Sequence, residues 1–306
     1  KMGYSGALST GSLAAGGTLG ILIPPSVILI IYSILTEQNI AKMFVAAFVP
    51  GFIAIMGYIL AIWIYVRLYP SSGPKSSLVG WGERFLLLKE IWQIMLIFAL
   101  VIGGIYLGLF TPTEGAAVGA AGTAAMAIVS KGFSKIDLIA VIEDTAVTTA
   151  MIFFILLGAE FFNAFIALTQ ITNELGNFVY HADLSPFTVL ALILVIYLLL
   201  GCIMDSLAMI LLTIPIFFPI IIGLDFGITP EEAAIWFGIL TLIVVEVGLI
   251  TPPVGLNAFV INKLSIDVPI SETFKGLLPF LISDLLRVLL LFTFPTITLF
   301  MVRLLY

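Results

Sequence analysis

Residues 20–29 read GILIPPSVIL, and two adjacent prolines, Pro24 and Pro25, interrupt one of the most apolar segments of the chain. Because proline lacks a backbone N–H group and its ring clashes with the preceding turn, the pair is expected to end any helix that runs into it. Residues 248–257, GLITPPVGLN, repeat the arrangement of a glycine, three residues and two prolines. Because the same helix break occurs twice in apolar sequence, we interpret it as a required feature of the fold.

The composition places the chain in a lipid bilayer. Of its 306 residues, 61% are hydrophobic and only 10% are charged, and the mean hydropathy is +1.25, well above the range of soluble domains. Apolar runs of about 20 residues, each enough to cross the bilayer as a helix, recur along the chain, and no alternating pattern typical of a barrel is present. We therefore predict an all-α polytopic membrane protein, with residues 1–306 forming one integral membrane domain.

Charge and cysteine content exclude several classes of function. With 12 basic and 18 acidic residues the net charge is -6, and the basic residues are dispersed, which argues against nucleic acid as a partner. One cysteine and one histidine argue against a disulfide framework or a Cys/His metal site. The chain starts at Lys1 with no signal peptide or preceding span, so we expect a fragment that lacks amino-terminal spans.

The two proline pairs predict two re-entrant helical hairpins, over residues 4–35 and 231–264. In such a hairpin two half-helices enter from one face of the membrane and meet at a non-helical tip, which is tolerated only where it is buried in protein or lines a cavity. The first half of 4–35 is rich in Gly, Ala and Ser, which let helices pack closely. The alternative is that residues 4–35 form one spanning helix, kinked at the prolines.

Two further breaks are predicted in long apolar tracts, at FTPTEG (residues 110–115) and GCIMDS (residues 201–206). Each backbone group freed at membrane depth costs several kcal/mol unless it finds a partner. In secondary transporters, unwound carbonyl groups coordinate Na+, and the positive ends of half-helices face substrate anions. The four breaks therefore predict Na+ as a coupling ion and an anionic substrate. We expect no organic cofactor.

Oxygen-bearing side chains gather at these breaks, and oxygen is the ligand that alkali cations accept. We expect Na+ near Asp205, Thr111 and Thr251, and no catalytic residue. The candidate ion-binding or substrate-binding residues are Thr18, Gly20, Pro24, Pro25, Ser26, Thr111, Pro112, Thr113, Glu114, Gly201, Asp205, Ser206, Gly248, Thr251, Pro252, Pro253, Gly255 and Asn257.

Four acidic residues in apolar sequence each need an explanation, because an acid at bilayer depth costs roughly 2.5–3.5 kcal/mol on insertion scales. Glu114 and Asp205 have a competing interpretation, in which each caps the helix that follows it. Glu160 and Glu246 have another, in which each pairs with a lysine or accepts a hydroxyl proton. Both interpretations stay open for each residue.

Two other helices are expected outside the breaks. An interfacial helix is predicted over 83–90, beside the longest polar loop. A last span is predicted over 277–304, where Asp284 and Arg287 are three residues apart. Residues at this spacing share one face of a helix, so we expect them to form a structural ion pair.

Four stretches together resemble the large membrane subunit of tripartite ATP-independent periplasmic (TRAP) transporters. They read GTLGILIPPSVILIIYSILTEQNIAKMFVAAFVPG, GLFTPTEGAAVGA, GCIMDSLAMILLTIPIFFPI and GLITPPVGLNAFVIN, they follow the family's order, and the resemblance covers nearly the whole chain. Several spans that precede the first hairpin in the family are absent.

The resemblance implies an elevator-type transporter with inverted repeats that uses Na+ to import organic acids (carboxylates). It further implies a small membrane (Q) subunit, a periplasmic substrate-binding protein (P), and a multi-pass position in a bacterial or archaeal inner (cytoplasmic) membrane. If the two hairpins are related by inversion, an odd number of crossings must separate them. The sequence shows four apolar segments there, at 43–69, 91–129, 150–171 and 184–222, so the crossing count and the orientation stay open.

Three other functions compete with this interpretation. A standalone ion and carboxylate symporter of a related hairpin fold would share the same breaks. An ion channel would use re-entrant loops as a filter, but it needs a continuous pore, and two dissimilar tips in one chain fit that poorly. An intramembrane enzyme would need a nucleophile with a base, or paired acids, and Asp205 has no second acid nearby in sequence, so we predict that the protein is not an enzyme.

Overall fold

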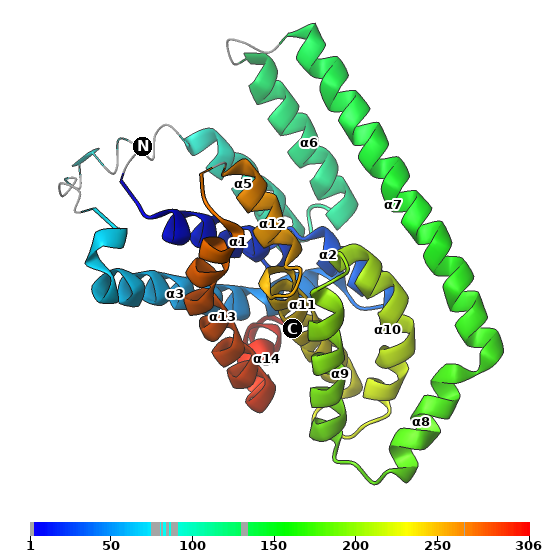
Figure 1. Cartoon of the computed structure of the whole chain (residues 1–306). Coiled ribbons are helices and arrows are strands. Elements are labelled where there is room, and N and C mark those ends of the chain that lie inside the picture. The colour runs from blue at the N-terminus through cyan, green and yellow to red at the C-terminus, as the bar shows by residue number, and fades with distance from the viewer. Residues whose placement is uncertain are drawn as a thin grey trace. The chain divides into compact units, whose positions relative to one another are not determined.

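The computed structural model describes residues 3–74, 80, 82–83, 86, 91–129, 134–265 and 267–306. These residues form helices joined by short connections and contain no strand, which confirms the predicted all-α class. The chain divides into two compact units (Figure 1): a first unit of Lys1–Pro74 with Gly158–Tyr306, and a second unit of Lys75–Leu157. The predicted interfacial helix over 83–90 lies largely outside the described residues.

The bounds of the helices follow the breaks that the sequence predicted. The first unit contains α1 (Gly6–Leu22), α2 (Val27–Leu35), α3 (Ile40–Leu68), the short 3-10 helix η1 (Pro70–Ser72), α8 (Ile171–His181), α9 (Pro186–Gly201), α10 (Ser206–Ile222), α11 (Pro230–Ile250), α12 (Leu256–Leu264), α13 (Ile270–Thr293) and α14 (Pro295–Leu305). The second unit contains α5 (Trp92–Tyr106) and α6 (Pro112–Val129), and α7 (Lys135–Thr169) begins in the second unit and ends in the first. Three of the four predicted breaks lie between helices, and the fourth, at residues 110–115, covers the end of the connection from α5 and the first turn of α6.

Within the part of the chain that the structure describes, five helical segments are long and apolar enough to cross a membrane. They are Gly6–Leu35, which joins α1 and α2, Ile40–Leu68, Asp137–Thr169, Pro230–Ile250 and Ile270–Thr293. Shorter apolar helices accompany them, including α9 and α10. The chain is thus a multi-pass membrane protein, while the re-entrant path of residues 4–35 and 231–264 stays a prediction.

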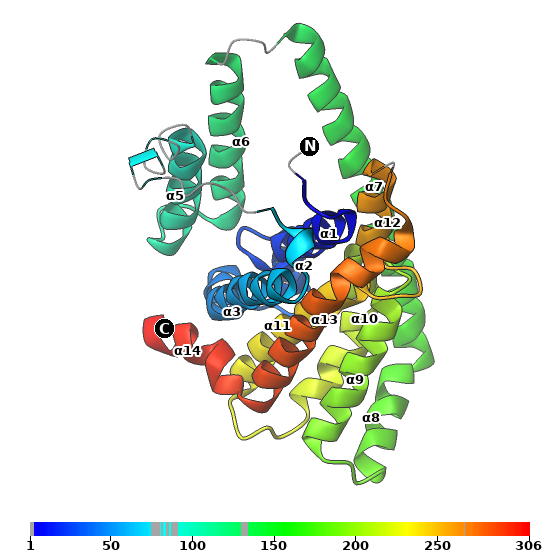
Figure 2. The ribbon, with the colours of Figure 1, turned by 60° about the vertical axis from the view of Figure 1, so that its left-hand side comes forward.

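Helix α11 forms the core of the first unit. It starts at a capping box, in which the Thr229 hydroxyl accepts from the Glu232 N–H group at 3.2 Å and Pro230 occupies the first helical position. Every residue from Ala233 to Ile250 is buried, as expected of a helix that is apolar on all sides. Helices α1, α3, α9, α10 and α13 pack around it, and Figure 2 shows α9, α10, α11 and α13 close together.

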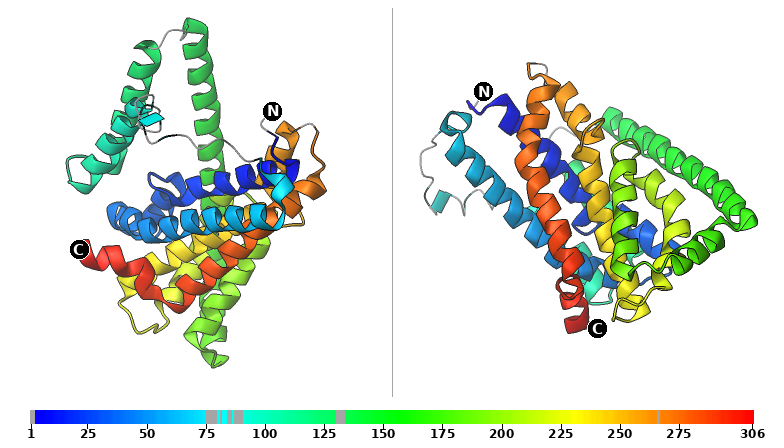
Figure 3. Two further views of the ribbon diagram at one scale, coloured as in Figure 1. Left: turned by 90° about the vertical axis from the view of Figure 1, so that its left-hand side faces the viewer. Right: turned by 60° about the horizontal axis from the view of Figure 1, so that its bottom comes forward.

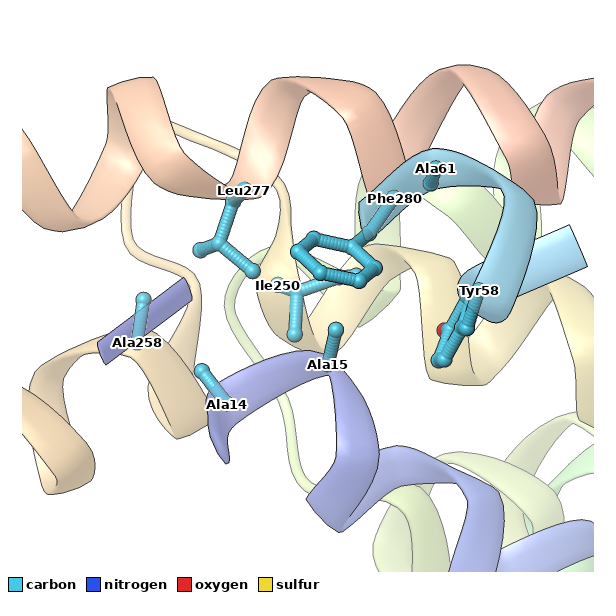
Figure 4. Packing of buried hydrophobic residues seen from close by; sticks show 8 residues of the cluster. All are labelled: Ala14, Ala15, Tyr58, Ala61, Ile250, Ala258, Leu277 and Phe280. Atoms are coloured by element: carbon cyan, nitrogen blue, oxygen red, sulfur yellow. The ribbon is translucent and has the colours of Figure 1, made fainter. Parts of the chain in front are cut away.

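Small residues allow α1 to pack closely on α13. A Cβ atom added at Gly276 on α13 would overlap the Ala7 carbonyl group of α1. The contact continues into an apolar cluster (Figure 4) made of Ala14, Ala15, Tyr58, Ala61, Ile250, Ala258, Leu277 and Phe280. This cluster joins α1, α3, α11, α12 and α13, and Figure 3 shows α13 running beside α3.

In the second unit, α5 and α6 pack on each other. The Cδ1 atom of Ile105 on α5 lies 2.9 Å from the position of a Cβ atom added at Gly115 on α6. Val101 and Ile105 are buried at this contact. The absence of a side chain at Gly115 therefore allows the start of α6 to approach α5.

Candidate functional site

The break between α9 and α10 covers residues 202–205 and ends at Asp205. Asp205 is half-buried, and both of its carboxylate oxygens lie 3.2 Å from the Ala208 backbone N–H group, which donates to them. Asp205 therefore caps α10, as the competing interpretation expected. A capping carboxylate keeps further lone pairs free, so this contact is compatible with the predicted Na+ ligand.

The second tip joins α11 to α12 through residues 251–255. The bond between Pro252 and Pro253 is cis, both prolines are exposed, and Gly255 has φ +61°, a left-handed conformation that glycine adopts readily. The Thr251 hydroxyl donates to the Val247 carbonyl oxygen at 2.5 Å. This tip therefore presents a turn of the main chain rather than a row of polar side chains.

The second tip lies directly on the break between α9 and α10. A Cβ atom added at Gly248 would lie 2.6 Å from the Cα atom of Gly201, so the two backbones touch at two glycines. The Cys202 thiol donates to the Pro252 carbonyl oxygen at 3.6 Å and to the Leu198 carbonyl oxygen at 3.2 Å. The structure thus brings together two predicted sites that are far apart in the sequence.

The first tip joins α1 to α2 through Pro24 and Pro25, whose peptide bond is also cis. Ser26 ends the tip: its hydroxyl accepts from the Leu29 N–H group at 3.3 Å and donates to the Ile21 carbonyl oxygen. Pro24 and Ser26 are buried, whereas Pro25 is exposed. The polar contacts of Ser26 described by the structure are local, so a ligand role for this residue stays a prediction.

Helices of the first tip contact the elements of the second. Ala14 and Ala15 on α1 pack in one cluster with Ile250 and Ala258, which flank the second tip (Figure 4), and α2 packs against α10. Gly20 is exposed near the end of α1. On α12, Asn257 is half-buried in the first turn, and Ser206 is the first residue of α10. The first unit therefore gathers three of the four breaks.

The fourth break, Thr111–Glu114, belongs to the second unit and starts α6. The Glu114 carboxylate accepts from the Thr111 N–H group at 2.8 Å and from the Thr111 hydroxyl at 2.9 Å, and the Glu114 N–H group donates back to that hydroxyl at 3.3 Å. Pro112 occupies the first turn, and Thr113 is exposed. This is a capping box, the competing interpretation for Glu114. A Na+ ligand at Thr111 stays a prediction.

Thr18 has a different environment from the other predicted residues. It is fully buried, its hydroxyl donates to the Ala15 carbonyl oxygen at 2.7 Å, and it lies 3.5 Å from the Tyr58 hydroxyl on α3. The Tyr58 hydroxyl in turn donates to Asp284 at 2.7 Å. Thr18 is therefore next to a buried group of charged residues.

This group consists of Glu246, Asp284 and Arg287, and we call it the charged cluster. The predicted pair is confirmed, because the Arg287 Nη2 atom lies 3.0 Å from the Asp284 Oδ1 atom. The same Nη2 atom lies 3.4 Å from the Glu246 Oε2 atom, so the partner of Glu246 is an arginine rather than the lysine considered from sequence. The i,i+3 spacing identified the pair on α13, but no spacing in the sequence links Glu246 to it.

Comparison with known proteins identifies the relatives of this chain. The family model described as "Tripartite ATP-independent periplasmic transporter, DctM component" matches residues 1–297. The chain is 35% identical over 98% of its length to the C4-dicarboxylate TRAP transporter large permease protein DctM of Pseudomonas aeruginosa. It is 33% identical over 99% of its length to the sialic acid TRAP transporter permease protein SiaT of Haemophilus influenzae. It is 32% identical over 98% of its length to the ectoine TRAP transporter large permease protein TeaC of Halomonas elongata.

These relatives are longer than this chain. The chain spans 68% of the Pseudomonas protein, 48% of the Haemophilus protein and 69% of the Halomonas protein. The matched part contains both proline pairs and both other breaks.

Proposed function

This chain belongs to the DctM component family of tripartite ATP-independent periplasmic transporters, and we propose that it is the membrane part of a Na+-coupled importer of an organic acid. In this proposal a periplasmic substrate-binding protein delivers the acid, a small membrane subunit accompanies the chain, and the complex resides in the inner membrane. The relatives are named for C4-dicarboxylates, sialic acid and ectoine. A carboxylate substrate is proposed here on the basis of the first two names and the predicted anion site.

One observation carries the proposal. The second tip, which contains Pro252 and Pro253, packs on the break between α9 and α10, and this break ends at the Asp205 carboxylate. Gly248 and Gly201 bring the two backbones into contact, and Asp205 lies three residues after Cys202, which contacts the tip at Pro252. Carbonyl groups released by the breaks and the Asp205 carboxylate supply the hard oxygen ligands that Na+ accepts. The residues present therefore fit a Na+ site.

In this proposal the Asp205 carboxylate and the start of α10 have different roles. Asp205 contributes negative charge to offset the cation, and it also fixes the start of α10 through its cap. The N-terminal end of α10 carries the positive end of a helix dipole, which favours a substrate anion. Ion and substrate would then hold the second tip against the break, and the unit that carries the tips would move as an elevator between the two sides of the membrane.

The test is uptake into proteoliposomes that contain the full-length membrane protein with its small subunit, supplied with the binding protein. Labelled C4-dicarboxylate and sialic acid are tested separately, each with an inward Na+ gradient. We expect accumulation of one acid that requires both the Na+ gradient and the binding protein. Equal uptake with K+ on both sides would refute the coupling, and uptake without the binding protein would indicate a standalone symporter.

A further inference from the structure

The charged cluster connects three helices at the centre of the first unit. Glu246 lies on α11, Asp284 and Arg287 lie on α13, and Tyr58 on α3 donates to Asp284. The Arg287 Nη2 atom reaches both carboxylates, at 3.0 Å and 3.4 Å. The cluster is therefore a buried, charged connection between α11 and the α3–α13 pair.

The cluster is closed off from its surroundings. The exposed fractions are 0% for Glu246, 1% for Asp284 and 3% for Arg287. A buried arginine that joins two carboxylates is costly to desolvate, and removing one partner leaves an uncompensated charge. Replacing its members with apolar residues of similar volume is often neutral or stabilising in other proteins, so stability alone does not account for a charged group at this place.

Its position on α11 indicates what it does. Glu246 and Gly248 are two residues apart, which is about 200° around a helix, so they face opposite sides of α11. On one side Glu246 is held by Arg287, and on the other Gly248 lies against the Gly201 backbone. The last turn of α11, which ends at Ile250, thus lies between α13 and the end of α9 where the break begins.

We propose that Arg287 is a positioning residue: through Glu246 it holds the last turn of α11 against the α9–α10 break and so sets the geometry of the second tip. Arg287 does not contact the ion or the substrate in this arrangement. The functional part of the inference rests on the proposed Na+-coupled transport. The geometric part rests only on the contacts of the first unit.

The native cysteine tests the geometric part directly. Cys202 is 5% exposed and its thiol contacts the Pro252 carbonyl group, so alkylation requires the tip to lift from the break. The rate of alkylation by N-ethylmaleimide, followed by mass spectrometry of the peptide that holds Cys202, therefore reports the open population. Loss of one charge-assisted hydrogen bond is expected to raise that rate about tenfold.

Two matched variants on the same helix separate positioning from a general effect of losing an ion pair. Glu246→Gln removes the negative charge that faces Arg287, and Glu232→Gln likewise removes the negative charge of the 2.6 Å contact with Arg303 at the other end of α11. We expect faster alkylation of Cys202 in Glu246→Gln and the wild-type rate in Glu232→Gln. Equal rates in the two variants, whether raised or not, would overturn the inference.

A second variant keeps the test decisive if Glu246→Gln does not reach the membrane. Arg287→Lys retains the positive charge, but the lysine side chain ends one bond short of the position of the Nη2 atom, which makes both carboxylate contacts in the wild type. It is expected to raise Cys202 alkylation in the same direction. A wild-type alkylation rate in a folded Arg287→Lys protein would overturn the inference.

Transport distinguishes this inference from the proposed function. In the full complex, Glu246→Gln is expected to raise the Na+ concentration for half-maximal uptake about tenfold while the maximal rate is retained, because the tip is misplaced but not removed. If the wild type needs no Na+ but the alkylation difference is found, the proposed coupling fails and the positioning role stands. If the wild type needs Na+ and Glu246→Gln changes neither measurement, the positioning role fails and the coupling stands.

Discussion

The contact between Gly201 and Gly248 makes a quantitative prediction for Gly248→Ala. The added Cβ atom would lie 2.6 Å and 2.7 Å from the Cα and C atoms of Gly201, and 3.1 Å from the Leu198 carbonyl oxygen. Carbon atoms in good contact are about 3.5–4.0 Å apart. All three neighbours are backbone atoms that cannot rotate away, so α9 and α11 must separate by roughly 1 Å.

The expected cost combines two opposing effects. Overpacking of this kind costs about 1–3 kcal/mol, and replacing a helical glycine with alanine returns about 0.5–1 kcal/mol. Because all three close neighbours are backbone atoms, the cost lies in the upper part of its range, about 2–3 kcal/mol, and the net loss of stability is about 1–2.5 kcal/mol. For a domain of this size, 1 kcal/mol corresponds to about 2–4 °C in melting temperature, so Gly248→Ala should lower it by several degrees.

Gly16→Ala is the matched control. Gly16 lies in the interior of α1, and an added Cβ atom there meets no atom within 4 Å. Because alanine favours a helix over glycine, this variant should melt at the wild-type temperature or slightly above it. Melting is measured by size-exclusion chromatography of heated, detergent-purified protein, and Cys202 alkylation at low temperature gives a local readout. If Gly248→Ala has the same melting temperature as Gly16→Ala, and if its Cys202 is alkylated at the wild-type rate, the close contact between Gly248 and Gly201 is refuted.

Three further predictions concern single side chains. Asp205→Asn should keep the cap of α10, whereas Asp205→Ala should lower the stability by about 1 kcal/mol. If Asp205 also binds Na+, the Asn variant should still lose the Na+ dependence of uptake. An unaltered Na+ affinity in that variant would remove Asp205 from the site. Tyr58→Phe removes the 2.7 Å donor to the buried Asp284 carboxylate and should cost about 1–3 kcal/mol in thermal stability, whereas an unchanged melting temperature would contradict that bond. Trp236→Phe removes the 2.9 Å bond from the indole N–H group to the Leu291 carbonyl oxygen, together with part of a fully buried side chain. It should lower the melting temperature without changing the Na+ dependence of uptake, and a specific change in that dependence would show that Trp236 acts on the site.

The prolines show how far local sequence rules extend in this protein. The two proline pairs correctly predicted the ends of α1 and α11, because consecutive residues without N–H groups cannot continue a helix. Single prolines did not have this effect: Pro50 lies inside α3, and Pro279 lies inside α13. In a membrane protein, neighbouring helices and side chains satisfy the one carbonyl group that a single proline frees, so only the packed structure decides which single prolines are tolerated.

Helix caps can also be predicted from the sequence. The sequence offers Asp205 and Glu114 as caps, and the structure shows both capping contacts. Such contacts join residues three positions apart, so their geometry follows from the helix itself. Whether the same carboxylates also bind an ion depends on groups from other helices, which a local pattern does not contain.

The sequence by itself determined the helical membrane class, the positions of the four breaks and the Asp284–Arg287 pair, because each depends on composition or on residues close together in the chain. The tertiary structure alone decided that Gly248 lies on Gly201, that Thr18 faces Tyr58, and that Arg287 rather than a lysine holds Glu246. The physical reason lies in α11, where every residue from Ala233 to Ile250 is buried. Apart from Thr241 and Glu246, residues 233–250 are apolar on every face of the helix, so α11 has no periodicity to indicate which face meets which neighbour, and its partners were set only when the helices packed.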